Sequence, residues 1–380
     1  MQRQTMVTRR GFIAGAAAGV ASAGLGFPRA VRAFPDRTPT EAAVPNGTVV
    51  LIDRNESPYG MSPASLRAIQ SVTESLSPRY PREEPAALTE ALANRFGVAK
   101  EQILLGCGST EILKIATETF CSPAGAAVVA EPTFEAVVTY SPLAHARAVK
   151  ISLTPNDYKH DLPKMLEAAT LVGGLIFFCN PSNPAGSFID KREVERFVRN
   201  VPSGIVPLVD EAYFDYADSP DYESCIRYVK EGLPILVSRT FSKIYGMAGL
   251  RVGYAIGHKD LIRQMSERRL VNNPNQLATA AALAGLKDEE HVARIRKLNA
   301  QVRDSLCAEL RAMGLQYIPS QTNFLMIDLK KPAKPVIEAL KQRKVMVGRL
   351  FPSMPNHMRV TLGSADEIKI FLNEFKQVMA

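Results

Sequence analysis

Short runs of apolar residues alternate along the chain with stretches whose apolar residues recur at helical spacing. The helix-like stretches lie at 111–120, 191–200 and 259–270. Five apolar runs, each ending in turn or polar residues, are the candidate strands: 126–130, 174–179, 206–209, 235–238 and 251–256. Because these runs are continuous rather than alternating, they predict an α/β fold whose sheet is mostly parallel and covered on both faces.

The pattern changes from about Gln276 onward. One long helical stretch is predicted from there to Ala312, ending before Gly314. Two candidate strands follow at 323–328 and 358–362, with helices at 335–343 and 365–379. This order predicts a second, smaller α+β domain. The predicted division of the chain is therefore a leader at 1–33, an N-terminal arm at 34–60, a large domain at 61–275 and a small C-terminal domain at 276–380.

Composition and charge argue against a nucleic-acid partner. The 380 residues are 46% hydrophobic and 22% charged, which is typical of globular proteins. Lysine and arginine outnumber acidic residues by 46 to 38, but five of the arginines lie in residues 1–33, which contain no acid. The remaining 41 basic and 38 acidic residues include no long basic run, so we expect no nucleic-acid binding.

The first thirty-three residues have the composition of a secretory signal. The string Thr8-Arg9-Arg10-Gly11-Phe12-Ile13 precedes a weakly apolar stretch, and small residues precede a cleavage site after Ala33. This layout resembles a twin-arginine signal and predicts export, to the periplasm in a bacterium. The alternative is a membrane anchor. Residues 11–27 are seventeen in number and include five glycines, whereas a stable membrane span needs about 20 strongly apolar residues. A leader that is not cleaved would still tether the protein to the membrane.

Cysteine and histidine give no sign of a metal site. The five cysteines (Cys107, Cys121, Cys179, Cys225 and Cys307) are odd in number and widely spaced, and the five histidines show no ligand spacing. We therefore expect no metal and no disulfide framework, and we interpret the thiols as small buried apolar groups.

Polar clusters follow the predicted strands, where ligands bind in an open parallel sheet. Taken singly, each cluster has a plain structural explanation: Lys243 as a solvated lysine, Asp210 as a helix cap, Asn183 as a turn residue. Together they form a candidate site. The clusters are Arg239-Thr240-Phe241-Ser242-Lys243, Asp210-Glu211-Ala212-Tyr213, residues 180–186, and Gly106-Cys107-Gly108-Ser109-Thr110, the last opening a helix.

The order and spacing of these clusters resemble those of the fold-type-I aminotransferases that depend on pyridoxal 5'-phosphate (PLP). Asn183 and Asp210 are 27 residues apart, Asp210 and Lys243 are 33 apart, and Arg251 follows 8 residues later. Within class I/II of these enzymes the chain is most similar to histidinol-phosphate aminotransferases. The supporting strings are Asn55-Glu56-Ser57-Pro58-Tyr59-Gly60, Arg79-Tyr80-Pro81, 180–186, 209–213, 239–243, Ala248-Gly249-Leu250-Arg251-Val252-Gly253-Tyr254 and Met358-Arg359-Val360-Thr361-Leu362-Gly363.

The resemblance implies PLP as the cofactor and assigns it a set of residues. Lys243 matches the lysine that forms a Schiff base with PLP and then moves the substrate proton. Asp210 matches the partner of the pyridine nitrogen, and Phe134 matches the ring that stacks on the cofactor. Hydrogen bonds to the ring hydroxyl are implied for Tyr213 and Asn183. The implied phosphate-binding residues are Ser109, Thr110, Thr240, Ser242 and Arg251.

Three further residues concern substrate and partner. Arg359 matches the family arginine that holds the acidic group of the substrate. Arg349 follows Val347-Gly348, where histidinol-phosphate enzymes place an arginine directly after the apolar pair, so this chain departs from the pattern of phosphate recognition. Tyr59 matches a tyrosine that reaches the neighbouring subunit's cofactor phosphate, which implies a homodimer with shared active sites.

The resemblance predicts an aminotransferase that moves an amino group between an amino acid, or a related primary amine, and a 2-oxo acid. Histidine synthesis is cytoplasmic, so the export signal conflicts with histidinol phosphate as substrate, and the amino donor stays open. One alternative is another PLP reaction on the same fold, by a decarboxylase, lyase or amine oxidase. The other is a non-catalytic binding protein, which the presence of Lys243, Asp210 and Arg251 disfavours.

Overall fold

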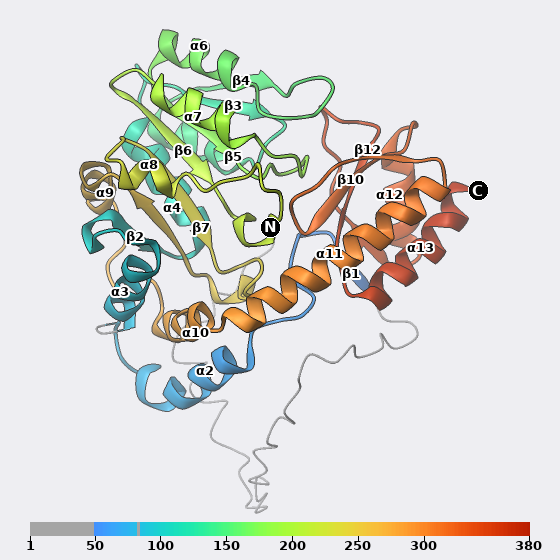
Figure 1. Ribbon diagram of the computed structural model, residues 1–380, viewed down its shortest axis with the longest axis horizontal. Helices are drawn as coiled ribbons and strands as arrows, with labels where there is room; N and C mark the ends of the chain where they lie inside the picture. Colours follow the sequence, from blue (N-terminus) through green and yellow to red (C-terminus); the bar gives the residue numbers. More distant parts are fainter. Residues whose placement is uncertain (1–48, 82–83) are drawn as a thin grey trace, which may run out of the picture. The chain divides into compact units, whose positions relative to one another are not determined.

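The computed structural model describes residues 49–81 and 84–380, so the predicted leader lies outside the described residues. A seven-stranded sheet organises the larger part (Figure 1). In this sheet β8 pairs antiparallel with β7 and β2, and the other pairs are parallel. Its order is β2 (Ile103–Gly106), β8 (Gly253–Gly257), β7 (Leu236–Thr240), β6 (Ile205–Asp210), β5 (Gly174–Cys179), β3 (Ala127–Glu131) and β4 (Ala148–Ser152). The predicted α/β fold with a mostly parallel sheet is confirmed.

Helices cover both faces of this sheet because the strands are apolar on both sides. Successive residues of β5 show the alternation, since Leu175 and Phe177 join one apolar core while Ile176 and Phe178 join the other. One core contains α4 (Gly108–Phe120), α5 (Ala136–Tyr140) and α9 (Lys259–Ser266). The other contains α3 (Glu84–Phe96), α6 (Leu162–Val172), α7 (Lys191–Arg199), α8 (Ile226–Lys230) and α10 (Gln276–Lys287), and α2 (Pro63–Leu76) packs on α10.

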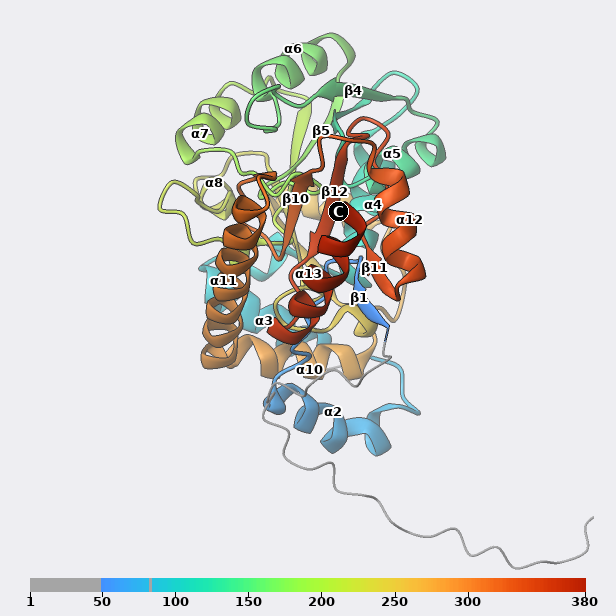
Figure 2. The ribbon, with the colours of Figure 1, turned by 90° about the vertical axis from the view of Figure 1, so that its right-hand side faces the viewer.

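A separate apolar core lies around a smaller sheet (Figure 2). Its antiparallel strands have the order β12 (His357–Thr361), β10 (Phe324–Asp328) and β9 (Gln316–Ile318). Beside them β1 (Val50–Ile52) pairs in parallel with β11 (Val345–Val347), so the N-terminal arm contributes a strand to the C-terminal part. The helices are α12 (Ala333–Gln342), α13 (Ala365–Met379) and the second half of α11 (Glu289–Ala312).

The two cores divide within α11 rather than at its start. Ile295 belongs to the core of the large sheet, whereas Val302 belongs to the core of the small one. The predicted domain boundary at residue 276 therefore does not coincide with the division between the cores, because α10 packs against α2 and α3.

The single helix predicted from Gln276 to Ala312 is wrong. Asp288 interrupts it with φ −92° and ψ 70°, and α10 ends there while α11 begins. The carboxylate of Asp288 accepts a hydrogen bond from the backbone N–H of His291 at 3.1 Å. An aspartate in this role caps the new helix, which is why the apolar periodicity continues across a break in the backbone.

The described residues contain neither a membrane-spanning helix nor a metal-binding cluster. Within 49–81 and 84–380, no helix combines the length and apolar content that crossing a membrane requires. The same residues hold no group of three or more His, Cys, Asp or Glu side chains that could bind a metal ion. Four of the cysteines are buried, but Cys107 is exposed because it lies in the turn where β2 ends and α4 begins.

Candidate active site

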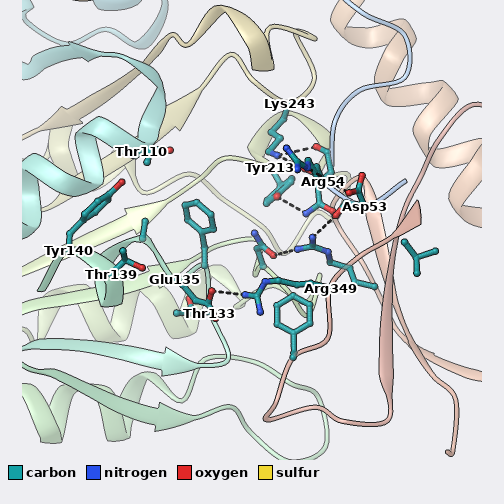
Figure 3. A pocket seen from close by; sticks show the side chains of 17 residues that line it. Asp53, Arg54, Thr110, Thr133, Glu135, Thr139, Tyr140, Tyr213, Lys243 and Arg349 are labelled. Atoms are coloured by element: carbon teal, nitrogen blue, oxygen red, sulfur yellow. Dashed lines mark hydrogen bonds and ion pairs between the residues drawn. The ribbon is translucent and has the colours of Figure 1, made fainter. Parts of the chain in front are cut away.

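The predicted polar clusters meet at one edge of the large sheet. Asp210 ends β6, Lys243 lies three residues beyond β7, and Asn183 follows β5. Because β8 runs opposite to β7, its first residues lie at the same edge, and Arg251 lies two residues before Gly253, where β8 begins. Two cavities of about 630 and 260 Å³ share part of their linings, namely Lys243, Asn183, Tyr213, Phe134, Thr110 and Arg54. Figure 3 shows the larger one.

The amine of Lys243 is held by backbone carbonyls of the N-terminal segment. Its Nζ donates to the carbonyl of Asn55 at 3.0 Å and lies 3.4 Å from that of Arg54. Burial lowers the pKa of Lys243 to about 8, and the positive charge of Arg359 adds to this effect, while Asp210 opposes it. A lysine with this pKa supplies a neutral, nucleophilic amine near physiological pH.

Asp210 is a buried carboxylate with one oxygen that the protein leaves without a hydrogen bond, although the backbone of Ala212 donates to the carboxylate. Its side chain is 4% exposed, and Oδ1 has no partner among the described residues. Burial raises the pKa of Asp210 to about 7, although the charge of Lys243 acts in the opposite direction. An unpartnered buried carboxylate is costly, so this oxygen is placed to receive a hydrogen bond from a bound N–H group.

The start of α4 and the guanidinium of Arg251 form an anion-binding corner. Ser109 and Thr110 lie in the first turn of α4, where backbone N–H groups point outward and favour negative charge. Arg251 Nη1 donates to the Ala248 carbonyl at 2.9 Å and lies 3.4 Å from Ser242 Oγ. The Thr240 hydroxyl donates to Ser242 Oγ at 2.8 Å, and all five side chains line the smaller cavity.

Glycine is required where this corner is closely packed. Gly108 has φ +74°, and a Cβ there would collide with the Arg251 guanidinium. A Cβ on Gly253 would collide with the backbone of Gly108 and Ser109. The glycines therefore allow β8 and the start of α4 to approach closely enough to surround an anion.

Arg359 lines the larger cavity together with Lys243. It is 9% exposed and donates through Nη1 to Asn183 Oδ1 at 2.8 Å and through Nη2 to the Asp53 carbonyl at 2.9 Å. Its Nε is buried without a protein partner among the described residues. Arg349, the second predicted substrate residue, lines the same cavity and forms an ion pair with Glu135 at 2.7 Å (Figure 3).

One predicted residue lies apart from this group. Tyr59 is absent from the linings of both cavities and lines a groove between α11 and α13 instead. Phe134 lines both cavities as expected.

Sequence reasoning missed the polar residues that hold the site together. Asn55 donates through Nδ2 to the Tyr213 hydroxyl at 3.0 Å, and its N–H donates to Thr361 Oγ1 at 2.9 Å. Asn323 Nδ2 in turn donates to the Asn55 carbonyl at 3.1 Å. Asn55 has φ +56°, a conformation that asparagine tolerates better than most residues, so Asn55-Glu56-Ser57-Pro58 was the available signal of a turn.

The residues present fit PLP. The cofactor carries a phosphate for the anion-binding corner, a ring nitrogen for the free oxygen of Asp210 and an aldehyde for the Lys243 amine. Phe134 offers an aromatic face, and the hydroxyl of Tyr213 lies close enough to the same cavity to contact a ring substituent.

Comparison with known proteins agrees with this geometry. The family model described as aminotransferase class I and II matches residues 48–375. A histidinol-phosphate aminotransferase of Moorella thermoacetica is 36% identical over 335 residues, covering 87% of this chain and 86% of the relative. One of Carboxydothermus hydrogenoformans is 37% identical, covering 86% of this chain and 90% of the relative. The solved structure of the Sinorhizobium meliloti histidinol-phosphate aminotransferase with PLP superposes with a TM-score of 0.80 at 25% identity, covering 87% and 91% of the two chains.

Proposed function

This chain belongs to the class I and II aminotransferase family, and on that basis we propose that Lys243 is its catalytic residue. The protein is a PLP-dependent transaminase, which moves an amino group between an amino acid or related primary amine and a 2-oxo acid. The observation that supports the assignment of Lys243 is its half-buried amine, whose pKa is lowered to about 8 and which interacts electrostatically with Asp210, a carboxylate with one oxygen unpartnered among the described residues.

Each residue around Lys243 has a distinct task in this proposal. When bound, PLP supplies an electron-accepting ring conjugated to the substrate carbon. Lys243 removes the proton from that carbon and returns it, because a pKa of about 8 leaves a substantial fraction of its amine neutral near physiological pH. With PLP bound, Asp210 would keep the ring nitrogen protonated, Tyr213 and Asn183 would donate hydrogen bonds to the ring hydroxyl, and Phe134 would stack on the ring.

The amino donor in this proposal is an amino acid whose carboxylate binds Arg359. The guanidinium is nearly buried, and its Nε has no protein partner among the described residues. It lies against the rings of Phe324 and Phe351, with its CZ atom 5.5 and 5.4 Å from their centroids. A desolvated arginine held in this way forms strong paired hydrogen bonds to a carboxylate.

The test is an absorbance spectrum of the PLP-loaded protein, recorded with single amino acids in the absence of any 2-oxo acid. We expect the visible cofactor band to decrease with at least one amino acid and to return when a 2-oxo acid is added. A band that no amino acid or primary amine changes would contradict the proposed donor class. A protein that acquires no cofactor band after incubation with PLP would contradict the whole assignment.

The Lys243→Ala variant tests the catalytic role separately. We expect turnover to fall by at least about 10³-fold, because no other lysine of the described residues lines either cavity. Phosphate contacts from Arg251 and the start of α4 should still retain PLP, which equilibrium dialysis measures. Lys259→Ala, in α9 outside both cavities, is the matched control. Normal turnover of the Lys243 variant would refute this role.

A homodimer with shared active sites is part of the same proposal. Tyr80, Leu270 and Val271 expose 75, 66 and 84% of their surfaces, an unusual amount for large apolar residues. Their segments are neighbours, because Gln276 Nε2 donates to the carbonyls of Leu76 and Arg79. We place these residues in the interface and assign Tyr59 to the phosphate of the partner's cofactor.

Export through the twin-arginine route is proposed from the leader sequence alone. Arg9 and Arg10 precede an apolar stretch that is too short and too rich in glycine to anchor strongly. We expect the double substitution Arg9→Lys, Arg10→Lys to retain the protein in the cytoplasm, measured by cell fractionation. Unchanged recovery from the periplasm would contradict this route.

A further inference from the structure

An ion pair between the two parts of the fold lies in the lining of the larger cavity. Glu135 comes from the segment between β3 and α5, and Arg349 follows β11. Their side chains are 57% and 48% exposed, and Oε2 and Nη2 are 2.7 Å apart (Figure 3). Among the described residues, no other ion pair or side-chain hydrogen bond holds the Glu135 carboxylate. Glu135 is therefore free to turn toward water if Arg349 takes another partner.

Arg349 has two contacts besides its ion pair with Glu135. Its guanidinium lies over the ring of Phe351, 4.3 Å from the centroid, and Nη1 donates to the Leu350 carbonyl at 3.2 Å. Phe351 is only 3% exposed, so the surface under the guanidinium is rigid. Loss of the glutamate would leave a positioned cation facing the cavity.

The cavity has an excess of positive charge. Arg349 and Arg359 lie against the same Phe351 ring, and the charge of Arg349 contributes to lowering the pKa of Arg359, second to burial. The charged lining residues are four cations and two carboxylates: Arg54, Lys243, Arg349 and Arg359 with Asp53 and Glu135. Two guanidinium groups that repel each other favour a ligand with two anionic groups over a ligand with one.

We propose that Glu135 is a specificity-determining residue. Its carboxylate occupies the position beside Arg349 at which the second carboxylate of a dicarboxylic substrate would bind. The proposal rests on the proposed function, in which the first carboxylate binds Arg359. Exposed ion pairs contribute little to stability, so a dicarboxylic amino acid or 2-oxo acid displaces Glu135 at small cost. Glu135 thus acts as an intramolecular competitor that weakens the binding of dicarboxylates and leaves monocarboxylates unaffected.

The test compares two unreactive ligands on the PLP-loaded protein. Succinate or glutarate serves as the dicarboxylate and butyrate as the monocarboxylate, and calorimetry and the cofactor absorbance give the dissociation constants. For Glu135→Gln we expect the dissociation constant of the dicarboxylate to fall by up to about fivefold, and that of butyrate to stay unchanged. For Arg349→Met we expect the dicarboxylate constant to rise at least about tenfold, with butyrate again unchanged.

Glu131→Gln is the matched control, because Glu131 is also a partly exposed glutamate at the end of β3 but does not line the cavity. We expect it to change neither constant. Equal effects of Glu135→Gln on both ligands, or none on the dicarboxylate, would overturn the proposal. Failure of the proposed donor class is distinguishable, since it appears in the wild-type protein as a cofactor band that no amino acid changes.

Discussion

At the scale of single residues, the site consists of charges that the fold itself disfavours. Burial raises the pKa of Asp210 to about 7 and lowers the pKa of Lys243 to about 8, so both groups are shifted toward their neutral forms. Residues whose pKa values are shifted in this way destabilise the cofactor-free protein, and their burial becomes favourable when a ligand supplies the missing partner.

Asp210→Asn should stabilise the cofactor-free protein at neutral pH. Because the folded pKa of Asp210 is raised, the wild-type protein loses stability as the pH rises from the ordinary value of 3.8 to about 7, and the loss is complete above that. Asparagine does not ionise and avoids this loss. We expect the variant to be more stable by about 1–3 kcal/mol at pH 8, with the difference disappearing toward pH 4.

Urea unfolding of both cofactor-free proteins across this pH range measures the effect. With PLP bound the order should reverse, because the carboxylate then has its partner. A variant that is less stable at every pH would show that the burial of Asp210 carries no cost.

The position of a site residue along the chain decides whether the sequence alone could indicate it. Asp210, Asn183 and Lys243 lie in polar clusters that follow apolar runs, so the strand pattern indicates their common edge, and the resemblance to the PLP-dependent enzymes implies their separate roles. Asn55 and Thr361 were not found because they are 306 residues apart and meet only through the folded backbone. Glu135 is an ordinary exposed glutamate in the sequence, and only Arg349 from the other end of the chain distinguishes it.

At the scale of elements, the approach of β8 to α4 determines the anion-binding corner. Gly253→Ala should weaken PLP binding, because its Cβ would push the first turn of α4 away from Arg251. We expect the dissociation constant of PLP to rise at least about tenfold, measured by dialysis. Gly249→Ala is the control, since a Cβ there meets nothing within 4 Å and should change the constant less than about twofold.

The strands that carry Asp210 and Lys243 are joined by a buried ion pair. Glu211 Oε2 accepts from Arg239 Nη2 at 2.7 Å and Nε at 3.0 Å, and both side chains are at most 4% exposed. Arg239 also lies over Phe214, 3.7 Å from the ring centroid. Removing one partner leaves a buried charge without compensation.

Glu211→Gln should therefore lower the free energy of unfolding by about 3–5 kcal/mol. The same substitution at Glu267, whose ion pair with Arg263 is exposed, should change it by less than about 1 kcal/mol. Chemical denaturation measures both. Equal small effects would mean that solvent or a rearrangement compensates the buried arginine.

The elements also show where the pattern of apolar residues is insufficient. It located β5 between its observed ends, and it located α4, α7 and α9 to within about four residues at either end, but it gave no bounds for α2, α3, α5, α6 and α8. It did not reveal the break at Asp288, because apolar periodicity does not report a local change in φ and ψ. It also could not give the direction of β8, which depends on how the segment around Lys243 turns.

At the scale of the whole molecule, the proposed dimer makes two inactive variants complementary. Lys243→Ala and Tyr59→Ala each remove a residue of a shared site, the lysine from its own chain and the tyrosine from the partner. In a mixed dimer one site lacks both residues and the other is intact. Random reassociation of equal amounts makes about half of the dimers mixed, and each mixed dimer has one intact site of two. We therefore expect denatured and refolded mixtures to regain about a quarter of the wild-type activity. Mixtures that show only the average activity of the two variants would exclude sharing.

The hydrogen bond between Asn55 and Thr361 has a consequence for synthesis on the ribosome. The ribosome makes the N-terminus first, so Lys243, Asp210 and the start of α4 are all synthesised before β12. Thr361 of β12 binds Asn55, and the carbonyl of Asn55 accepts the hydrogen bond from the Lys243 amine. A nascent protein can therefore assemble its cofactor-binding surface early and complete the surrounding enclosure only when its last fifth has been translated. Export by a route that accepts folded proteins would select for chains that had reached that final stage.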